Sequence, residues 1–162
     1  MNGIWPDKPP SGQGLSTVGE DQWVQMELTA DTGACDSVMP LKGSCEHIRI
    51  QPSEQSESGM LYEVANSQTI PNLGERRLQI WTEGSAMPMG MAIQVADVHK
   101  PLLSLSRCAD LGYESRFGKH AGFLIEVTTG EIIPLHRVGN LYMLCVWVKA
   151  APDPNSPFGG PR

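Results

Sequence analysis

The sequence has no long apolar run and no excess of basic residues. No stretch reaches the roughly 18–20 apolar residues that cross a bilayer, and the first residues lack the basic and then apolar pattern of a signal peptide. The 12 Lys and Arg residues are outnumbered by 18 Asp and Glu residues, giving a formal net charge of -6, whereas phosphate-backbone binding needs clustered cations. We therefore expect a cytoplasmic, intracellular protein with neither a membrane nor a nucleic-acid partner.

Cysteine is also scarce. The four cysteines show no Cys-x-x-Cys spacing, which argues against a structural zinc site; they are Cys35, Cys45, Cys108 and Cys145. The fragment Cys45-Glu46-His47 could offer two metal ligands, but neighbouring side chains on a strand point to opposite faces and no second ligand pair accompanies them. We expect reduced thiols, no metal and no cofactor.

Length and composition fit one folded unit with extended ends. A chain of 162 residues suits one domain, since domains commonly contain about 100–150 residues. Residues 1–20 are rich in Gly, Pro and Ser, and residues 150–162 carry four prolines, which is typical of linkers. The interpretation is a flexible linker over residues 1–20, a folded domain over 21–149 and a second linker over 150–162, as if cut from a longer polypeptide.

Alternation of apolar and polar residues in the middle of the chain predicts an all-β fold. Trp23–Leu28 has the period of a strand with one buried face and leads into Asp31. Leu141–Val148 is so continuously apolar that burial on both faces, or in an interface, is expected. The polar segment Gln51–Gly59 is interpreted as an exposed loop. Further strands or apolar stretches are expected at Ser37–Pro40, Tyr62–Ala65, Thr69–Pro71, Leu78–Trp81, Met91–Val95, Phe123–Val127 and Ile132–Leu135, with hairpin turns at Asn66–Gln68 and Thr128–Glu131.

One short helix interrupts this pattern. Ser104 can cap its N-terminus, and Leu105–Leu111 gives about two turns. Gly112 follows at the position where a left-handed residue commonly ends a helix. We expect a helix of Leu105–Leu111 and no other.

Asp31 is the candidate catalytic residue. It follows an apolar strand and precedes Thr32 and Gly33, so it lies where a strand ends and the chain turns. The Thr32 hydroxyl can fix the turn by hydrogen bonding, and Gly33 has no Cβ to obstruct a close approach. Hydrolysis of a peptide without a metal needs a base and an acid together, and two adjacent carboxylates that share a proton supply both. The alternative is that Asp-Thr-Gly-Ala is an ordinary turn in a β scaffold.

The segment Asp31-Thr32-Gly33-Ala34-Cys35-Asp36-Ser37-Val38-Met39 resembles the active-site segment of retroviral and retrotransposon proteases. The likeness continues in order over Trp23–Val148: the hairpin at Tyr62–Ile70 falls where that family has its flap, and Pro101–Ser104 with the following helix resembles its hydrophobic-hydrophobic-Gly element. The segment Val95–Leu144 is similar to copia-type retrotransposon polyproteins.

This resemblance implies a retropepsin-like aspartic endopeptidase: a closed, mainly antiparallel β-barrel with one short helix that cleaves its own polyprotein and is located inside cells, within retroelement particles for instance. Extended substrate would lie between flap and catalytic loop by strand addition. The resemblance assigns catalysis to Asp31, Thr32 and Gly33. It assigns substrate binding to Ala34, Cys35, Asp36, Val38, Asn66, Ser67, Gln68, Ile70 and Leu103.

Only one Asp-Thr/Ser-Gly occurs in the sequence. A carboxylate pair on this template must therefore come from two chains, with a twofold axis between two copies of Asp31. Asp36, Asp97 or Asp110 would be the partner in an intramolecular pair, but none follows a strand in the same way.

Three positions depart from the family pattern. Ser104 stands where the family has glycine, Cys35 where many members have aspartate, and the flap turn Asn66–Gln68 lacks glycines. These departures motivate the alternative hypothesis of a retropepsin fold without turnover, which would serve as a dimerisation or peptide-binding module.

Overall fold

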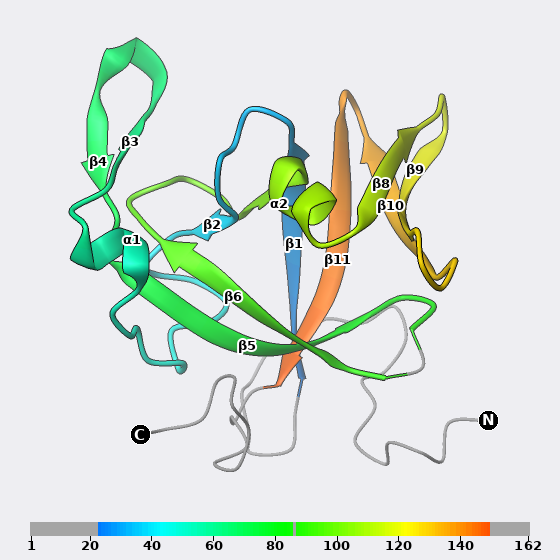
Figure 1. The fold of residues 1–162 in the computed structure, drawn as a ribbon, viewed down its shortest axis with the longest axis horizontal. Helices are drawn as coiled ribbons and strands as arrows, with labels where there is room; N and C mark the ends of the chain where they lie inside the picture. The colour runs from blue at the N-terminus through cyan, green and yellow to red at the C-terminus, as the bar shows by residue number, and fades with distance from the viewer. Residues whose placement is uncertain (1–22, 86, 150–162) are drawn as a thin grey trace.

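Six strands of the computed structural model close into a barrel (Figure 1). The structure describes residues 23–85 and 87–149, so the linkers expected at 1–20 and 150–162 lie outside the described residues. The barrel order is β1-β7-β2-β6-β5-β11, and β11 pairs back with β1. Its strands are β1 (Trp23–Asp31), β2 (Val38–Met39), β5 (Gly74–Thr82), β6 (Met89–Val95), β7 (Leu102–Ser104) and β11 (Leu141–Lys149).

Two smaller β units extend from the barrel on opposite sides (Figure 1). A hairpin of β3 (Leu61–Glu63) and β4 (Thr69–Pro71), joined by the 3-10 turn η1 (Ala65–Ser67), forms a separate two-stranded sheet. On the other side the sheet continues from β11 through three antiparallel strands. They are β10 (Ile132–Val138), β9 (Ala121–Glu126) and β8 (Tyr113–Phe117).

The all-β prediction and the closed barrel are confirmed, but the expectation of one short helix is wrong. Besides α2 (Leu105–Asp110), a second helix, α1 (Glu54–Glu57), lies in the polar segment expected to be an exposed loop. Ser53 is buried and caps α1, because its side chain accepts from the Ser56 backbone while Ser56 bonds back to it. A four-residue helix without a buried apolar face carries no helical periodicity, so only tertiary contacts define it.

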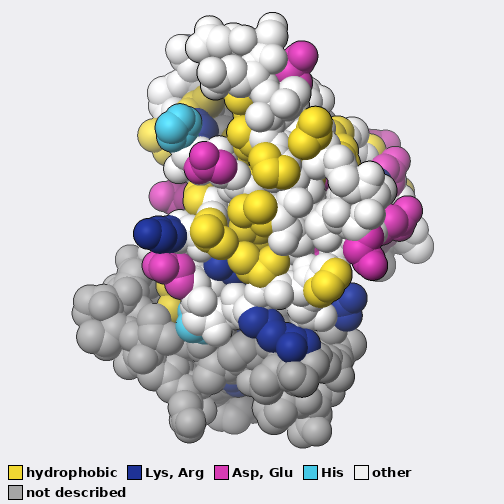
Figure 2. Space-filling model, turned by 90° about the vertical axis from the view of Figure 1, so that its left-hand side faces the viewer, with side chains coloured by type: hydrophobic (Ala, Val, Ile, Leu, Met, Phe, Trp, Pro, Cys, Tyr) yellow, Lys and Arg dark blue, Asp and Glu magenta, His cyan; other side chains and the backbone are white. Residues whose placement is uncertain are grey.

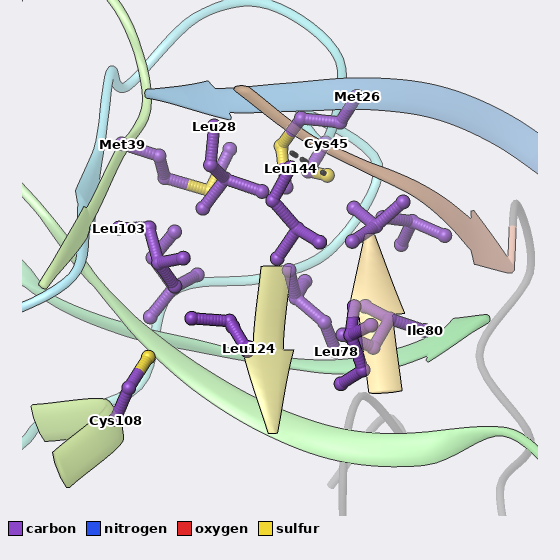
Figure 3. Packing of buried hydrophobic residues seen from close by; sticks show 14 of the residues in the cluster. Met26, Leu28, Met39, Cys45, Leu78, Ile80, Leu103, Cys108, Leu124 and Leu144 are labelled. Atoms are coloured by element: carbon purple, nitrogen blue, oxygen red, sulfur yellow. Dashed lines mark hydrogen bonds between the residues drawn. The ribbon is translucent and has the colours of Figure 1, made fainter. Parts of the chain in front are cut away.

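Strand β11 is buried on both faces, as its continuous apolar character predicts. Alternate residues point into the main core, which is built from the barrel strands, α2 and the β8–β10 extension (Figure 3). These inward residues of β11 are Leu144, Val146 and Val148. Cys145 and Trp147 face the other way, into a cluster with Trp23 and Trp81. Trp23 and Trp81 pack edge to face with ring centroids 6.1 Å apart, so the strand gains apolar contacts on each side.

The helix expected after Pro101 is confirmed as α2, and it joins the site to the core. Ser104 caps it and Gly112 follows it with φ +96°, the left-handed conformation that favours glycine. Leu105 and Cys108 anchor the helix in the core. Strand β8, which follows directly, was not expected: it pairs only with β9, and its alternation is weak because most of its side chains are exposed. None of the helices in the described ranges combines the length and apolar character needed to cross a membrane.

Candidate functional site

Asp31 is the last residue of β1 and lies at the rim of the barrel. The strand pairs in parallel with β7, with Asp31 opposite Ser104. The preceding residues of β1 are largely buried, whereas Asp31 is partly exposed and Thr32 and Gly33 are exposed. A carboxylate is therefore held at the end of a rigid strand with one side open to solvent, as the sequence predicts.

The backbone after Asp31 orients its carboxylate. The Gly33 amide donates a hydrogen bond of 2.7 Å to Asp31 Oδ1. A Cβ added at Gly33 would approach the same oxygen to 3.3 Å, tighter than most real Cβ contacts. A side chain at this position would therefore require the Asp31 carboxylate to shift by a few tenths of an ångström.

The loop that carries Ala34 and Cys35 is braced from β7 and α2, which lie beneath it. Strand β7 inserts between β1 and β2, the two strands that the loop connects. Ser104 Oγ donates 2.6 Å to the Ala34 carbonyl, and the Ser104 amide donates 2.9 Å to Ser37 Oγ. Ser104 is fully buried. Ser104 therefore holds both limbs of the loop and also caps α2.

Asp36, a predicted substrate contact, is buried and fully engaged by its own chain. Its Oδ1 accepts from Arg107 Nε at 3.0 Å and Nη2 at 2.8 Å, and from Gln55 at 3.4 Å. Its Oδ2 accepts from the Tyr62 hydroxyl at 2.9 Å. Arg107 Nε also donates 3.0 Å to the Cys35 carbonyl. The hydrogen bonds and charge of Asp36 raise the pKa of Arg107, so the guanidinium stays charged and its hydrogen bonds fix the far limb of the loop.

The other predicted substrate contacts are divided between the surface and the core. Ala34 is partly exposed and Cys35 is exposed on the loop, and Ile70 is half-buried on the hairpin. Val38 and Leu103 are buried, and Leu103 belongs to the main core beneath the loop. In the single chain these two side chains support the loop from below.

The predicted flap turn has a strained but compact geometry. Asn66, Ser67 and Gln68 are all exposed, and the Val64 amide closes the turn on the Gln68 carbonyl at 2.8 Å. Asn66 (φ 69°) and Ser67 (φ 60°) both adopt the left-handed conformation. Asparagine tolerates this conformation, whereas for serine it costs about 1 kcal/mol. The turn therefore adopts the left-handed backbone conformation that glycine favours, although it contains no glycine.

The side of the molecule that carries the β3–β4 hairpin has an apolar region next to the hairpin (Figure 2). Figure 2 shows hydrophobic side chains gathered across the middle of this face. Exposed large hydrophobic residues of the segments on this side of the barrel are Leu41, Leu61 and Leu73.

None of the three other candidate carboxylates forms a pair with Asp31. Asp36 is held by Arg107, Asp97 is exposed after β6, and Asp110 lies 4.0 Å from Arg107 Nη1. In the described part of the chain, no group of three or more His, Cys, Asp and Glu residues could hold a metal ion. Among the described residues, none of these carboxylates therefore pairs with Asp31 within the single chain.

Sequence reasoning missed the residues that tie the site together. Tyr62 was assigned only to a strand and Arg107 only to the helix, yet both bind Asp36. Asn72, one residue after β4, was not singled out, although it is buried and its side chain makes four hydrogen bonds. The available signal was three polar residues beside apolar strands, and polar residues in such places are usually hydrogen-bonded.

No protein-family model, curated protein or solved structure matches this chain. A functional proposal therefore depends on the chemistry of the Asp31 loop itself. One partly exposed carboxylate, held by a local amide on a braced loop, can act as a base or as an acid but not as both at once. Two such carboxylates brought together would share a proton and act as base and acid at once.

Proposed function

We propose that this protein is an aspartic endopeptidase of retropepsin type that works as a homodimer. Asp31 of each copy would supply half of a carboxylate pair across a twofold axis. One carboxylate deprotonates the attacking water while its protonated twin polarises the peptide carbonyl, and the leaving nitrogen is protonated as the C–N bond breaks. The observation that carries the proposal is the Asp31-Thr32-Gly33 turn, partly exposed at the end of a buried strand and braced by Ser104.

The geometry supports this proposal in two ways. Exposed Thr32 and Gly33 leave a side of the loop open to a second copy. The hydrogen bonds from Ser104 and Arg107 to the loop carbonyls fix its shape before substrate arrives, and a pre-organised site avoids reorganisation during reaction.

The proposed substrate is an extended polypeptide, in the first place the polyprotein of a retroelement inside the cell. It would lie between the Asp31 loop and the β3–β4 hairpin, forming backbone hydrogen bonds as an added strand. Apolar side chains would contact Ala34 and Ile70, which are partly exposed on the two sides of this space.

Cleavage of a peptide library near pH 5, with and without a statine-type inhibitor, tests the proposal. We expect cleavage that the inhibitor blocks and that Asp31→Asn slows by about 10²–10⁴-fold, because the amide cannot serve as a base. Asp110→Asn is the matched control, since it changes an exposed carboxylate outside the loop. Cleavage by Asp31→Asn at the wild-type rate would refute the proposal.

Dependence on dilution tests the dimer separately. Each active site needs two chains, so specific activity should fall as the protein is diluted through the dissociation constant. Activity per chain is measured from micromolar to low nanomolar protein, alongside sedimentation velocity. Constant specific activity together with a sedimenting monomer would exclude the shared site.

The second candidate function is a dimerisation or peptide-binding module without turnover. The observation that favours it is the glycine-free hairpin turn with Asn66 and Ser67 at positive φ, because a stiff flap slows the opening that admits substrate. Inhibitor or peptide binding by a folded dimer that cleaves nothing would select this function over the first.

A further inference from the structure

The β3–β4 hairpin shares no strand pairing with the barrel. Its strands have three residues each and pair only with one another, in a sheet separate from the barrel. The outer residues Leu61 and Glu63 of β3 are exposed, and Tyr62 between them is half-buried. The orientation of the hairpin is therefore not set by a shared ladder of backbone hydrogen bonds.

The Tyr62 hydroxyl lies between two anchors. It donates 2.9 Å to Asp36 Oδ2 and accepts from Asn72 Nδ2 at 2.8 Å. Burial raises the pKa of Tyr62, and the neighbouring Asp36 adds to the increase. The hydroxyl is thus protonated at any ordinary pH and remains available as a donor.

The first anchor leads to the Asp31 loop. Asp36 follows Cys35 on that loop, and Arg107 binds the Asp36 carboxylate and the Cys35 carbonyl together. A continuous chain of hydrogen bonds therefore links Tyr62 of the hairpin to the backbone four residues after Asp31.

The second anchor lies at the base of the hairpin. The Asn72 amide group donates to Gln94 of β6 at 2.9 Å, and its carbonyl oxygen accepts from the Gly74 amide at 2.8 Å and from Ser53 Oγ at 3.3 Å. Asn72, Gln94 and Ser53 are all buried. Satisfied buried networks of this kind specify one arrangement, because a change of orientation would leave several polar groups unpaired.

We propose that Tyr62 is a positioning residue that clamps the β3–β4 hairpin to the Asp31 loop through Asp36. The clamp would set the height of the hairpin above the loop, and hence the space for an extended peptide. The effect on substrate rests on the proposed protease function, whereas the clamp itself does not.

Tyr62→Phe removes the hydroxyl and keeps the ring. Hydrogen-deuterium exchange of the full chain is expected to become about 3- to 10-fold faster in peptides covering 61–71, the change in opening equilibrium for about one net hydrogen bond. Exchange in β1 and β11 should be unchanged. Tyr142→Phe is the matched control, because that hydroxyl donates to the Gly118 carbonyl in the β8–β11 extension, and it should leave the hairpin as it is.

Several outcomes would overturn the clamp. They are unchanged exchange at 61–71 in Tyr62→Phe, an equal increase throughout the barrel, failure of the variant to fold, or the same hairpin response in Tyr142→Phe. In each case the hydroxyl would have no role specific to the hairpin.

Peptidase kinetics test whether the clamp affects substrate binding. If the chain is active, Tyr62→Phe should raise KM by a similar 3- to 10-fold with a smaller change in kcat, because bound substrate itself holds the hairpin closed. An inactive wild-type chain with selective loosening of the hairpin would refute the protease and leave the clamp standing. A fall in kcat with unchanged KM would contradict the positioning role.

Discussion

Asp31 and Asp36 lie five residues apart on one loop and have opposite surroundings. Asp31 is partly exposed and has a single local partner, the Gly33 amide. Asp36 is buried and accepts hydrogen bonds from three other side chains of the same chain. A buried carboxylate engaged by three side chains stabilises structure, whereas a partly exposed one remains accessible to water or to a ligand. Under the proposed function, Asp31 would therefore act in the reaction and Asp36 would support the loop.

The largest expected effect is the difference in activity between two single variants, Asp31→Asn and Asp36→Asn. Asp31→Asn should lower kcat by about 10²–10⁴-fold, the usual contribution of a general base, while leaving the thermal midpoint unchanged because the side chain supports little else. Asp36→Asn should retain measurable kcat. Equal losses in both variants, at equal folded fractions by circular dichroism, would mean that the two carboxylates do not have separate roles.

Asp36 is also expected to contribute to the stability of the fold. Asp36→Ala removes the acceptor of Tyr62, Gln55 and Arg107 and should lower the free energy of unfolding by about 1–3 kcal/mol. The lower half of this range is favoured because the Arg107 side chain is 53% exposed and water can replace its partner. Urea denaturation provides the measurement, with Asp110→Ala as control. A loss no greater than that of the control would show that the network around Asp36 contributes nothing.

A smaller effect is expected at Ser104, beneath the loop. Ser104→Ala removes the helix cap and the bond to the Ala34 carbonyl, and should destabilise by about 1–2 kcal/mol. Ser104→Gly restores the residue of the resembled family and caps nearly as well, so it isolates the loop contact. Equal unfolding free energies for wild type and both variants would exclude a bracing role.

The smallest expected effect is chemical labelling of Cys35, which tests whether the loop after Asp31 is exposed to solvent. Cys35 lies between the two carboxylates and is exposed. Burial raises the pKa of Cys45 to about 12 and that of Cys108 to about 11, so at pH 8 both remain neutral thiols and poor nucleophiles. Iodoacetamide at pH 8 should therefore modify Cys35 first, as mass spectrometry of peptides can show. Early labelling of Cys45 or Cys108 in folded protein would contradict the burial described here.

Much of the fold could be predicted because its strands have strong local patterns. Trp23–Leu28 alternates and Leu141–Val148 is continuously apolar, and both correspond to long strands with many buried residues. The hairpin turn at Asn66 and the helix after Ser104 were found from turn and cap residues. Helix α1 and strand β8 were missed because their residues are polar and gain their structure from neighbours.

The candidate site was predicted only in part. The turn Asp31-Thr32-Gly33 carries its own signal, since an apolar strand leads into it and a glycine stands at its third position. The role of Asp36 could not be read in the same way. Its partners Tyr62 and Arg107 lie 26 and 71 residues away along the chain, and no local pattern reports such a separation.

Local sequence patterns are enough to predict which segments alternate, where a helix can begin, and that one carboxylate follows a buried strand. These properties depend on neighbouring residues and on the periods of strand and helix. Long-range packing, in contrast, is what places Arg107 and Tyr62 within hydrogen-bonding distance of Asp36, sets Ser104 beneath the loop, and buries Val38 and Leu103. These contacts depend on which distant segments the closed barrel brings together. Polar groups that become buried there must then form hydrogen bonds with one another.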